Sequence, residues 1–170
     1  MRQKYCLAYK CVRTTRFGEL ISAWNGLAPA LQVEYKLNKV TRGKSPVLPL
    51  FLVSSKNNIT ESLISISTGY DTILVVKVKE SDLIKTNRDI WLPYNVKYRE
   101  VEKWVESTQN MEFEVDHKRI YKDVKLVVDC YAHAVKPVEV IKKDEGTGLF
   151  SGLLSKMVER EKKYRCKFIY

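Results

Sequence analysis

The sequence has few of the residues that bind metals or form redox pairs. Its only histidines, His117 and His133, are far apart in the chain. No two of its cysteines have the C-x-x-C spacing of a zinc knuckle or a redox pair. We therefore predict no metal site and interpret the cysteines as small apolar core residues. They are Cys6, Cys11, Cys130 and Cys166.

Long apolar runs are also missing. No run approaches the ~20 residues that a membrane-spanning helix needs. The N-terminal residues lack the apolar core of a secretory signal. The expectation from these absences is a cytoplasmic protein without a transmembrane segment. A hydrophobic content of 45% over 170 residues is enough to build one core, so we predict a single domain spanning residues 1–170.

Carboxylates are scarce in the first part of the chain. Residues 1–60 contain ten Lys and Arg but only two Asp and Glu, whereas residues 61–145 contain fourteen against sixteen. The net charge of +10 is therefore regional, with a smaller basic excess after residue 145. Such asymmetry indicates a polyanionic partner, such as nucleic acid or a phosphate-bearing ligand. A solvated basic face without a partner is the alternative.

The strong catalytic motifs are absent. The chain has no G-x-x-x-x-G-K-[ST], no G-x-G-x-x-G, no H-E-x-x-H and no G-x-S-x-G. These absences give no support to a P-loop enzyme, a Rossmann dehydrogenase, a zincin or an α/β-hydrolase. The short Gly146-Thr147-Gly148 run is interpreted as a flexible entry to a helix.

The pattern of apolar residues predicts an α+β fold built mainly from an antiparallel β-sheet. Residues 71–79 are the strongest strand candidate, because a continuous apolar run there gives way to alternation, as in a central strand. Residues 14–18 are predicted to form the turn of a hairpin. The predicted strands are residues 5–13, 19–24, 31–37, 50–53, 71–79, 112–115, 124–135, 138–141 and a closing strand within 165–170.

Two helices are predicted. A short one follows residue 56, over residues 59–67, where Asn58 and Glu61 have the spacing of a capping box. An amphipathic C-terminal helix is predicted over residues 149–164, after a linker at 142–148. Its apolar stripe consists of Leu149, Phe150, Leu153, Leu154, Met157 and Val158.

Three further stretches complete the prediction. Residues 38–49, with one glycine and two prolines, are predicted to be an exposed basic loop, and residues 89–95 to be irregular. Residues 94–107 fit a helix and a strand equally well.

Aromatic and basic residues occur together near the N-terminus. Tyr5 and Tyr9 have the same strand parity as Arg13, and Tyr35 precedes a basic stretch. Tyrosines flanked by cations could stack on bases while the cations hold phosphates, although the face with Tyr5 and Tyr9 could equally be core. The candidate polyanion-binding residues are Lys10, Arg13, Arg16, Lys36, Lys39, Arg42 and Lys44.

The order of some elements suggests an enzyme. A first strand ends in Arg13, a later strand runs into Ser54, and Glu100-Val101-Glu102 comes further on. This order resembles the arginine–serine–glutamate class of ADP-ribosyltransferases, although Val53-Ser54-Ser55 replaces their Ser-Thr-Ser. The resemblance implies that Arg13 and Ser54 hold NAD and that Glu102, with Glu100 beside it, stabilises an oxocarbenium-like transition state.

The leading interpretation is a non-enzymatic protein that needs no cofactor and binds a polyanion through its basic N-terminal region. An ADP-ribosyltransferase-like enzyme using NAD is the alternative. A third interpretation is a subunit of a larger assembly that binds a protein partner through the C-terminal helix. The composition also resembles that of small phage-encoded accessory proteins, which implies a location in the host cytoplasm.

Overall fold

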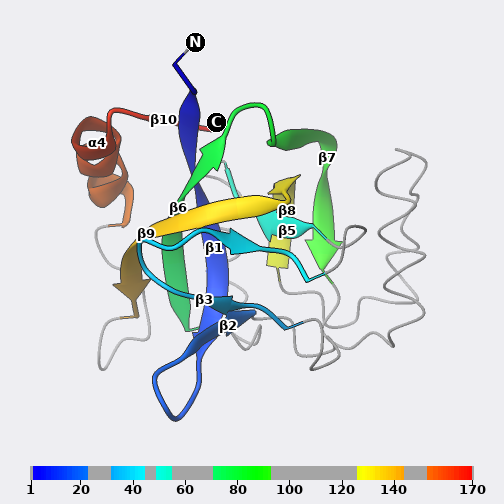
Figure 1. The fold of residues 1–170 in the computed structure, drawn as a ribbon, viewed down its shortest axis with the longest axis vertical. Coiled ribbons are helices and arrows are strands. Elements are labelled where there is room, and N and C mark those ends of the chain that lie inside the picture. The colour runs from blue at the N-terminus through cyan, green and yellow to red at the C-terminus, as the bar shows by residue number, and fades with distance from the viewer. Residues whose placement is uncertain are drawn as a thin grey trace.

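The computed structural model describes residues 2–22, 32–44, 49–54, 71–92, 126–143 and 153–169. Its strands and its one described helix follow one another along the chain as shown in Figure 1. They are β1 (Tyr5–Thr14), β2 (Leu20–Ser22), β3 (Glu34–Tyr35), β4 (Thr41–Arg42), β5 (Leu50–Leu52), β6 (Thr72–Lys79), β7 (Ile84–Leu92), β8 (Leu126–Ala132), β9 (Ala134–Lys142), α4 (Leu153–Tyr164) and β10 (Lys167–Phe168).

The strands form two sheets. The larger one has the order β3-β2-β1-β6-β9-β4, with β10 paired to β1 outside this path, and the smaller one has the order β5-β8-β7. Every pairing between these strands is antiparallel except the parallel pair of β1 and β10. The α+β fold with a mainly antiparallel sheet is as the sequence predicts.

Strand β1 is the centre of the larger sheet. One of its edges pairs with the whole of β6, from Tyr5 opposite Lys79 to Val12 opposite Thr72. Its other edge is shared by three partners: β10 at the start, Val53 at Tyr9 and β2 at the end. Because both edges and both faces are occupied, its middle residues are nearly all apolar and buried.

One cluster of core residues joins the two sheets. Ala8, Leu74 and Val76 of the large sheet pack there with residues of β5 and β8, including Leu52 and Ala132. The opposite face of β1 carries Tyr9, whose ring stacks on Phe168 of β10 at 5.4 Å between centroids. All four cysteines are free and buried, as expected of apolar core residues.

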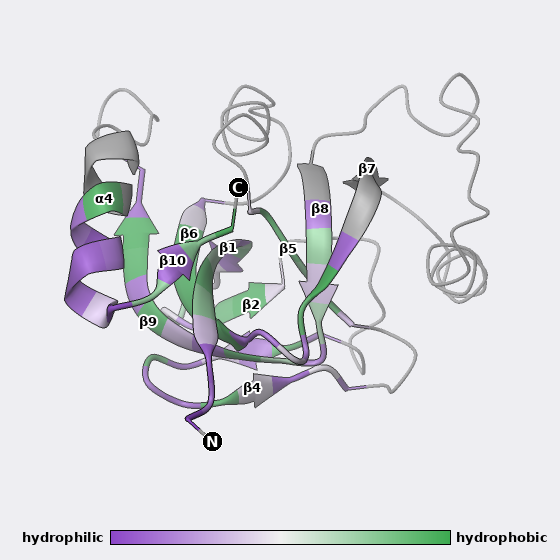
Figure 2. Cartoon of the chain, turned by 90° about the horizontal axis from the view of Figure 1, so that it is seen from above, coloured by the Kyte–Doolittle hydropathy of each residue, from purple (hydrophilic) through white to green (hydrophobic). Residues whose placement is uncertain are grey.

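Helix α4 lies beside β9 and β10 (Figure 2). Its Arg160 side chain is buried and forms an ion pair with the partly exposed Glu139 of β9, and the hydroxyl of Tyr164 donates to the carbonyl oxygen of Val138 at 3.1 Å. The closing strand β10 then returns to the same sheet. The described part of α4 is thus fixed on the large sheet by polar contacts near its C-terminal end.

Several predicted elements differ from the observed ones because their pairing is set by distant residues. The predicted loop at 38–49 contains β4, which pairs with β9. Residues 89–95 are not wholly irregular, since β7 continues to Leu92 and Pro93 follows it. The predicted strand at 124–135 is two strands, because the chain turns at His133 from one sheet into the other.

Other predictions lie outside the described residues. These are the helix at 59–67, the ambiguous stretch at 94–107, the strand at 112–115 and most of the linker at 142–148. The same holds for Leu149 and Phe150 and for the side chains of Leu153, Leu154 and Met157. The remaining member of the predicted stripe, Val158, is 52% exposed, so the amphipathic stripe stays a prediction. Within the described ranges, no helix is long and apolar enough to cross a membrane.

Candidate functional site

The basic segment, which we define as residues 36–44, is fixed along the edge of β9. The main-chain N–H of Asn38 donates to the carbonyl oxygen of Pro137 at 2.8 Å. Thr41 and Arg42 pair with Val135 and Ala134, and the N–H of Gly43 donates to the carbonyl oxygen of His133 at 3.1 Å. A stretch that the sequence predicts to be a loop is therefore held by three successive main-chain attachments.

The cations of the basic segment are exposed. Lys36 forms an ion pair of 3.7 Å with Glu34, but both side chains are about half exposed, so the pair adds little stability. Lys39, Arg42 and Lys44 form no ion pair within the part of the chain that the structure describes. The positive charge of the segment is therefore not neutralised by described carboxylates.

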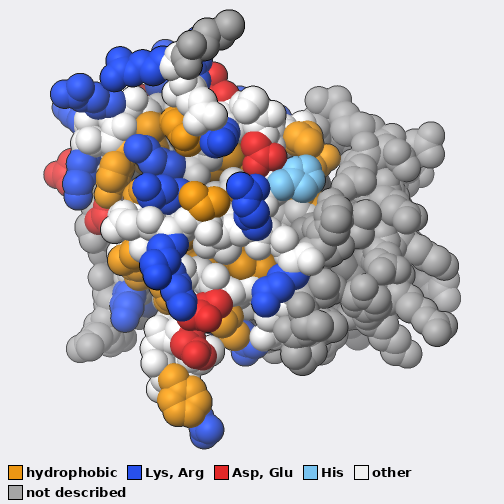
Figure 3. Space-filling view, viewed as in Figure 1, with side chains coloured by type: hydrophobic (Ala, Val, Ile, Leu, Met, Phe, Trp, Pro, Cys, Tyr) orange, Lys and Arg blue, Asp and Glu red, His pale blue; other side chains and the backbone are white. Residues whose placement is uncertain are grey.

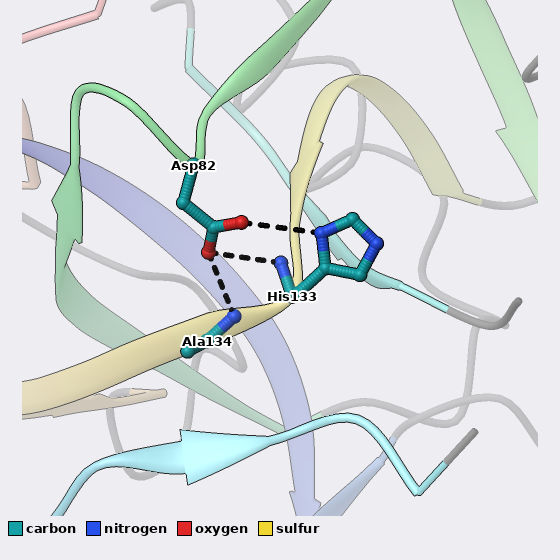
Figure 4. A network of polar contacts seen from close by, with 3 residues as sticks. All are labelled: Asp82, His133 and Ala134. Atoms are coloured by element: carbon teal, nitrogen blue, oxygen red, sulfur yellow. Dashed lines mark hydrogen bonds and ion pairs between the residues drawn. The ribbon is translucent and has the colours of Figure 1, made fainter. Parts of the chain in front are cut away.

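The corner between the two sheets sets the position of β9. Here β8 ends, the chain turns at His133, and β9 begins at Ala134. The Asp82 carboxylate accepts hydrogen bonds from the N–H groups of His133 and Ala134 at 3.1 and 3.0 Å (Figure 4). Its second oxygen lies 3.1 Å from Nδ1 of His133. One oxygen of Asp82 thus serves as the acceptor for two main-chain donors at the bend.

Further cations lie on the same surface but come from later in the sequence. Lys136 of β9 is exposed and lies directly opposite Lys77 of β6. The ammonium of Lys77 lies 5.7 Å from the centre of the Tyr5 ring and 5.8 Å from that of Tyr164. Figure 3 shows Lys and Arg side chains spread over this face of the molecule.

These later cations could not be found from the sequence because their closeness depends on strand register. The available signal is the alternation at the end of β6, which places Lys77 and Lys79 on one face. Nothing in the local sequence shows that Lys136 is the residue opposite Lys77. The Val75–Val76 irregularity in the β6–β9 ladder adds to this difficulty, because it shifts the register.

Lys10 lies inside the protein and not on its surface. Its ammonium donates to the carbonyl oxygen of Phe51 at 2.8 Å and lies 6.0 Å from the centre of the Tyr35 ring. Burial lowers the pKa of Lys10 from 10.5 to about 8. Since Lys10 is only 8% exposed, it takes no part in an exposed cationic surface.

Arg13 and Arg16 lie at the far end of β1 from Tyr5. Arg13 is half-buried, and its Nε is a buried atom with no hydrogen-bond partner among the residues that the structure describes. Arg16 is exposed beyond the end of β1, with its guanidinium 4.7 Å from the centre of the Phe17 ring. Arg13 and Tyr5 are eight residues apart on the strand, or about 27 Å at the usual rise. The two arginines are therefore not grouped with Lys77.

The residues of the transferase resemblance are not brought together where the structure describes them. Ser54 follows Val53, which pairs with Tyr9, so Ser54 lies further from Arg13 than Tyr9 does. The expected separation along β1 is about 17 Å. The hydroxyl and N–H of Ser54 both donate to Asp129 of β8. Glu100 and Glu102 lie outside the described residues, so the transferase interpretation stays a prediction.

Two other results bear on function. Among the described residues, no group of three His, Cys, Asp or Glu side chains is placed to hold a metal ion. No family model, no curated protein and no solved structure matches the chain.

Proposed function

We propose that this protein binds a polyanion, either nucleic acid or another phosphate-bearing ligand, through the basic segment and the adjoining surface of β9. The observation that carries the proposal is the attachment of residues 36–44 to β9 while Lys39, Arg42 and Lys44 stay exposed and free of ion pairs within the described ranges. The proposal concerns binding, and no catalytic step is assigned to the surface.

The physical advantage of this arrangement is preorganisation. A flexible basic loop loses conformational entropy when it binds, whereas a segment already hydrogen-bonded to a sheet loses less. Cations within about one Debye length of each other, about 10 Å at moderate salt, also act together on one anion. Arg42 and Lys136 meet this condition, because β4 and β9 are adjacent strands.

The test is a pair of charge reversals. Arg42→Glu changes a cation of the basic segment, and Lys142→Glu changes an exposed cation at the other end of β9. Both variants change the net charge equally. We expect Arg42→Glu to weaken binding of a labelled oligonucleotide and of polyphosphate and to lower the salt slope by about 1, whereas Lys142→Glu changes both much less.

Fluorescence anisotropy at several salt concentrations measures both quantities, and thermal melting checks that each variant is folded. Equal losses from the two variants would show that only net charge matters, and the assignment to the basic segment would be wrong. Absence of binding at low salt to DNA, RNA and polyphosphate would rule out the proposed function.

A further inference from the structure

One end of the large sheet carries an exposed surface that the helix leaves open. The residues Tyr5, Lys77 and Lys136 share one face, because Tyr5 pairs with Lys79 and Lys77 pairs with both Leu7 and Lys136. Further along this face, α4 is attached to β9 through Glu139. Helix attachment and open surface therefore lie side by side on the same strands.

The first unusual feature of this open surface is a pair of like charges. Lys77 and Lys136 are direct cross-strand neighbours, an arrangement that destabilises a sheet because the two ammonium groups repel each other. Neither lysine has an ion pair with a carboxylate in the described part of the chain. An anion placed between the two ammonium groups would remove the repulsion.

The second feature is the position of two tyrosine rings around Lys77. Its ammonium lies within cation–π distance of both Tyr5 and Tyr164, which restricts where the charge can move. Lys163 adds a second cation at 5.3 Å from the centre of the Tyr164 ring. Tyr5 is 37% exposed, and its hydroxyl donates to Oε1 of Gln3, two residues before it. The Tyr5 ring is thus a partly exposed aromatic surface beside a fixed cation.

The third feature is continuity with the basic segment. The strands β1, β6, β9 and β4 are consecutive neighbours, so the surface crosses the sheet from Tyr5 to Arg42. Val40 precedes β4 in the same segment and is 59% exposed. Three spacings between neighbouring strands give a width of about 14 Å. This stretch offers alternating aromatic, cationic and apolar contacts.

We propose that the surface from Tyr5 through Lys77 and Lys136 to Arg42 binds single-stranded nucleic acid. A backbone phosphate lies between the two lysines, and an unpaired base stacks on the Tyr5 ring. A base inside a duplex does not offer its face to a side chain, so stacking selects a single strand. This inference rests on the proposed function and specifies the class of polyanion.

The decisive experiment compares two exposed aromatic residues. Tyr5→Leu removes the ring of the proposed surface, and Phe17→Leu removes a ring that also lies beside a cation, Arg16, but away from that surface. We expect Tyr5→Leu to weaken binding of a labelled single-stranded 12-nucleotide DNA or RNA by at least about 5-fold, the loss of one stacked base. Tyr5→Phe, which keeps the ring, restores binding.

Polyphosphate provides the second arm, because it has phosphates but no bases. Tyr5→Leu should leave polyphosphate binding unchanged, and Phe17→Leu should leave both ligands unchanged. Comparison of DNA and RNA strands then identifies the preferred nucleic acid. If Tyr5→Leu has no effect, or weakens polyphosphate and oligonucleotide equally, the stacking inference is wrong. Tighter binding of duplex than of single strand overturns it as well.

The lysine pair has an independent readout. Lys136→Met should weaken binding of both ligands and, in the free protein, raise the melting temperature, since the cross-strand repulsion is removed. An unchanged affinity or a lower melting temperature contradicts the anion site between Lys77 and Lys136. If these tests fail while Arg42→Glu still weakens binding, the proposed function stands without this inference. If no polyanion binds at all, both fall.

Discussion

Replacing buried Lys10 by methionine should make the stability of the protein less dependent on pH. The structure holds the Lys10 ammonium in a buried site, where it donates to the Phe51 carbonyl oxygen and lies beside the Tyr35 ring. Desolvation by burial lowers the pKa of Lys10 from 10.5 to about 8, and the nearby thiols of Cys11 and Cys130 offset only part of this effect. The folded protein therefore binds the Lys10 proton more weakly than the unfolded chain does.

The sign of the effect follows from this difference in proton affinity. Below the folded pKa of about 8, Lys10 is charged in both states, and the folded state bears the whole cost of the buried charge. As the pH rises from about 8 to 10.5, the folded state releases this proton first, so the cost disappears and stability is gained. The full shift corresponds to about 3 kcal/mol.

The assay is urea denaturation of the wild type and of Lys10→Met at a series of pH values. Lys10→Met should be the more stable protein at about pH 7, and its advantage should shrink by about 2 kcal/mol by about pH 10. Only the difference between the two proteins is informative, because buried Cys11 and Tyr35, whose pKa values burial raises, titrate in both. Lys79→Met, at an exposed position at the end of β6, is the matched control and should show a constant difference. A difference for Lys10→Met that does not vary with pH would refute the reasoning.

Two further predictions concern the polar contacts that fix β9. Glu139→Gln should cost about 3 kcal/mol, because the side chain of Arg160 is only 7% exposed and is left without a counter-charge. Arg160→Met should cost less, because the side chain of Glu139 is 32% exposed and can be hydrated. Urea denaturation measures both, and a larger loss from Arg160→Met would contradict this account. Asp82→Ala should cost about 1–2 kcal/mol, because two main-chain donors at the corner lose their acceptor. Asp82→Ala should also weaken polyanion binding, because the corner positions His133, to which Gly43 of the basic segment is attached. An Asp82→Ala variant with normal melting and normal binding would show that the corner does not depend on Asp82.

The sequence predicts the elements whose character is set locally. The apolar run from Ile73 to Val76 indicates a strand buried on both faces, and this strand is found between β1 and β9. The turn after β1 and its hairpin partner also follow from local residues, including Gly18, which adopts a positive φ of 83°.

Elements that depend on a distant partner are not predictable in this way. Strand β4 is two residues long and is followed by glycine- and proline-containing sequence, so only its pairing with β9 makes it a strand. The same limit applies to the candidate site. Local sequence identifies Arg42 and Lys44 as exposed cations, but Lys136 is their neighbour only because β4 pairs with β9 in this register. Local sequence also groups Lys10 with these exposed cations, because a lysine in a strand does not reveal which face of the strand is buried.

The parallel pairing of β1 with β10 has a consequence for how the protein is made. Cys6 and Leu7 complete their main-chain hydrogen bonding only with Lys167 and Phe168, which the ribosome adds last among the described strands. During synthesis the start of β1 is therefore an open, apolar strand edge, the kind of surface that pairs with other chains. Contacts so distant in sequence also slow folding. A nascent chain that stops before β10 would expose this edge for as long as it persists.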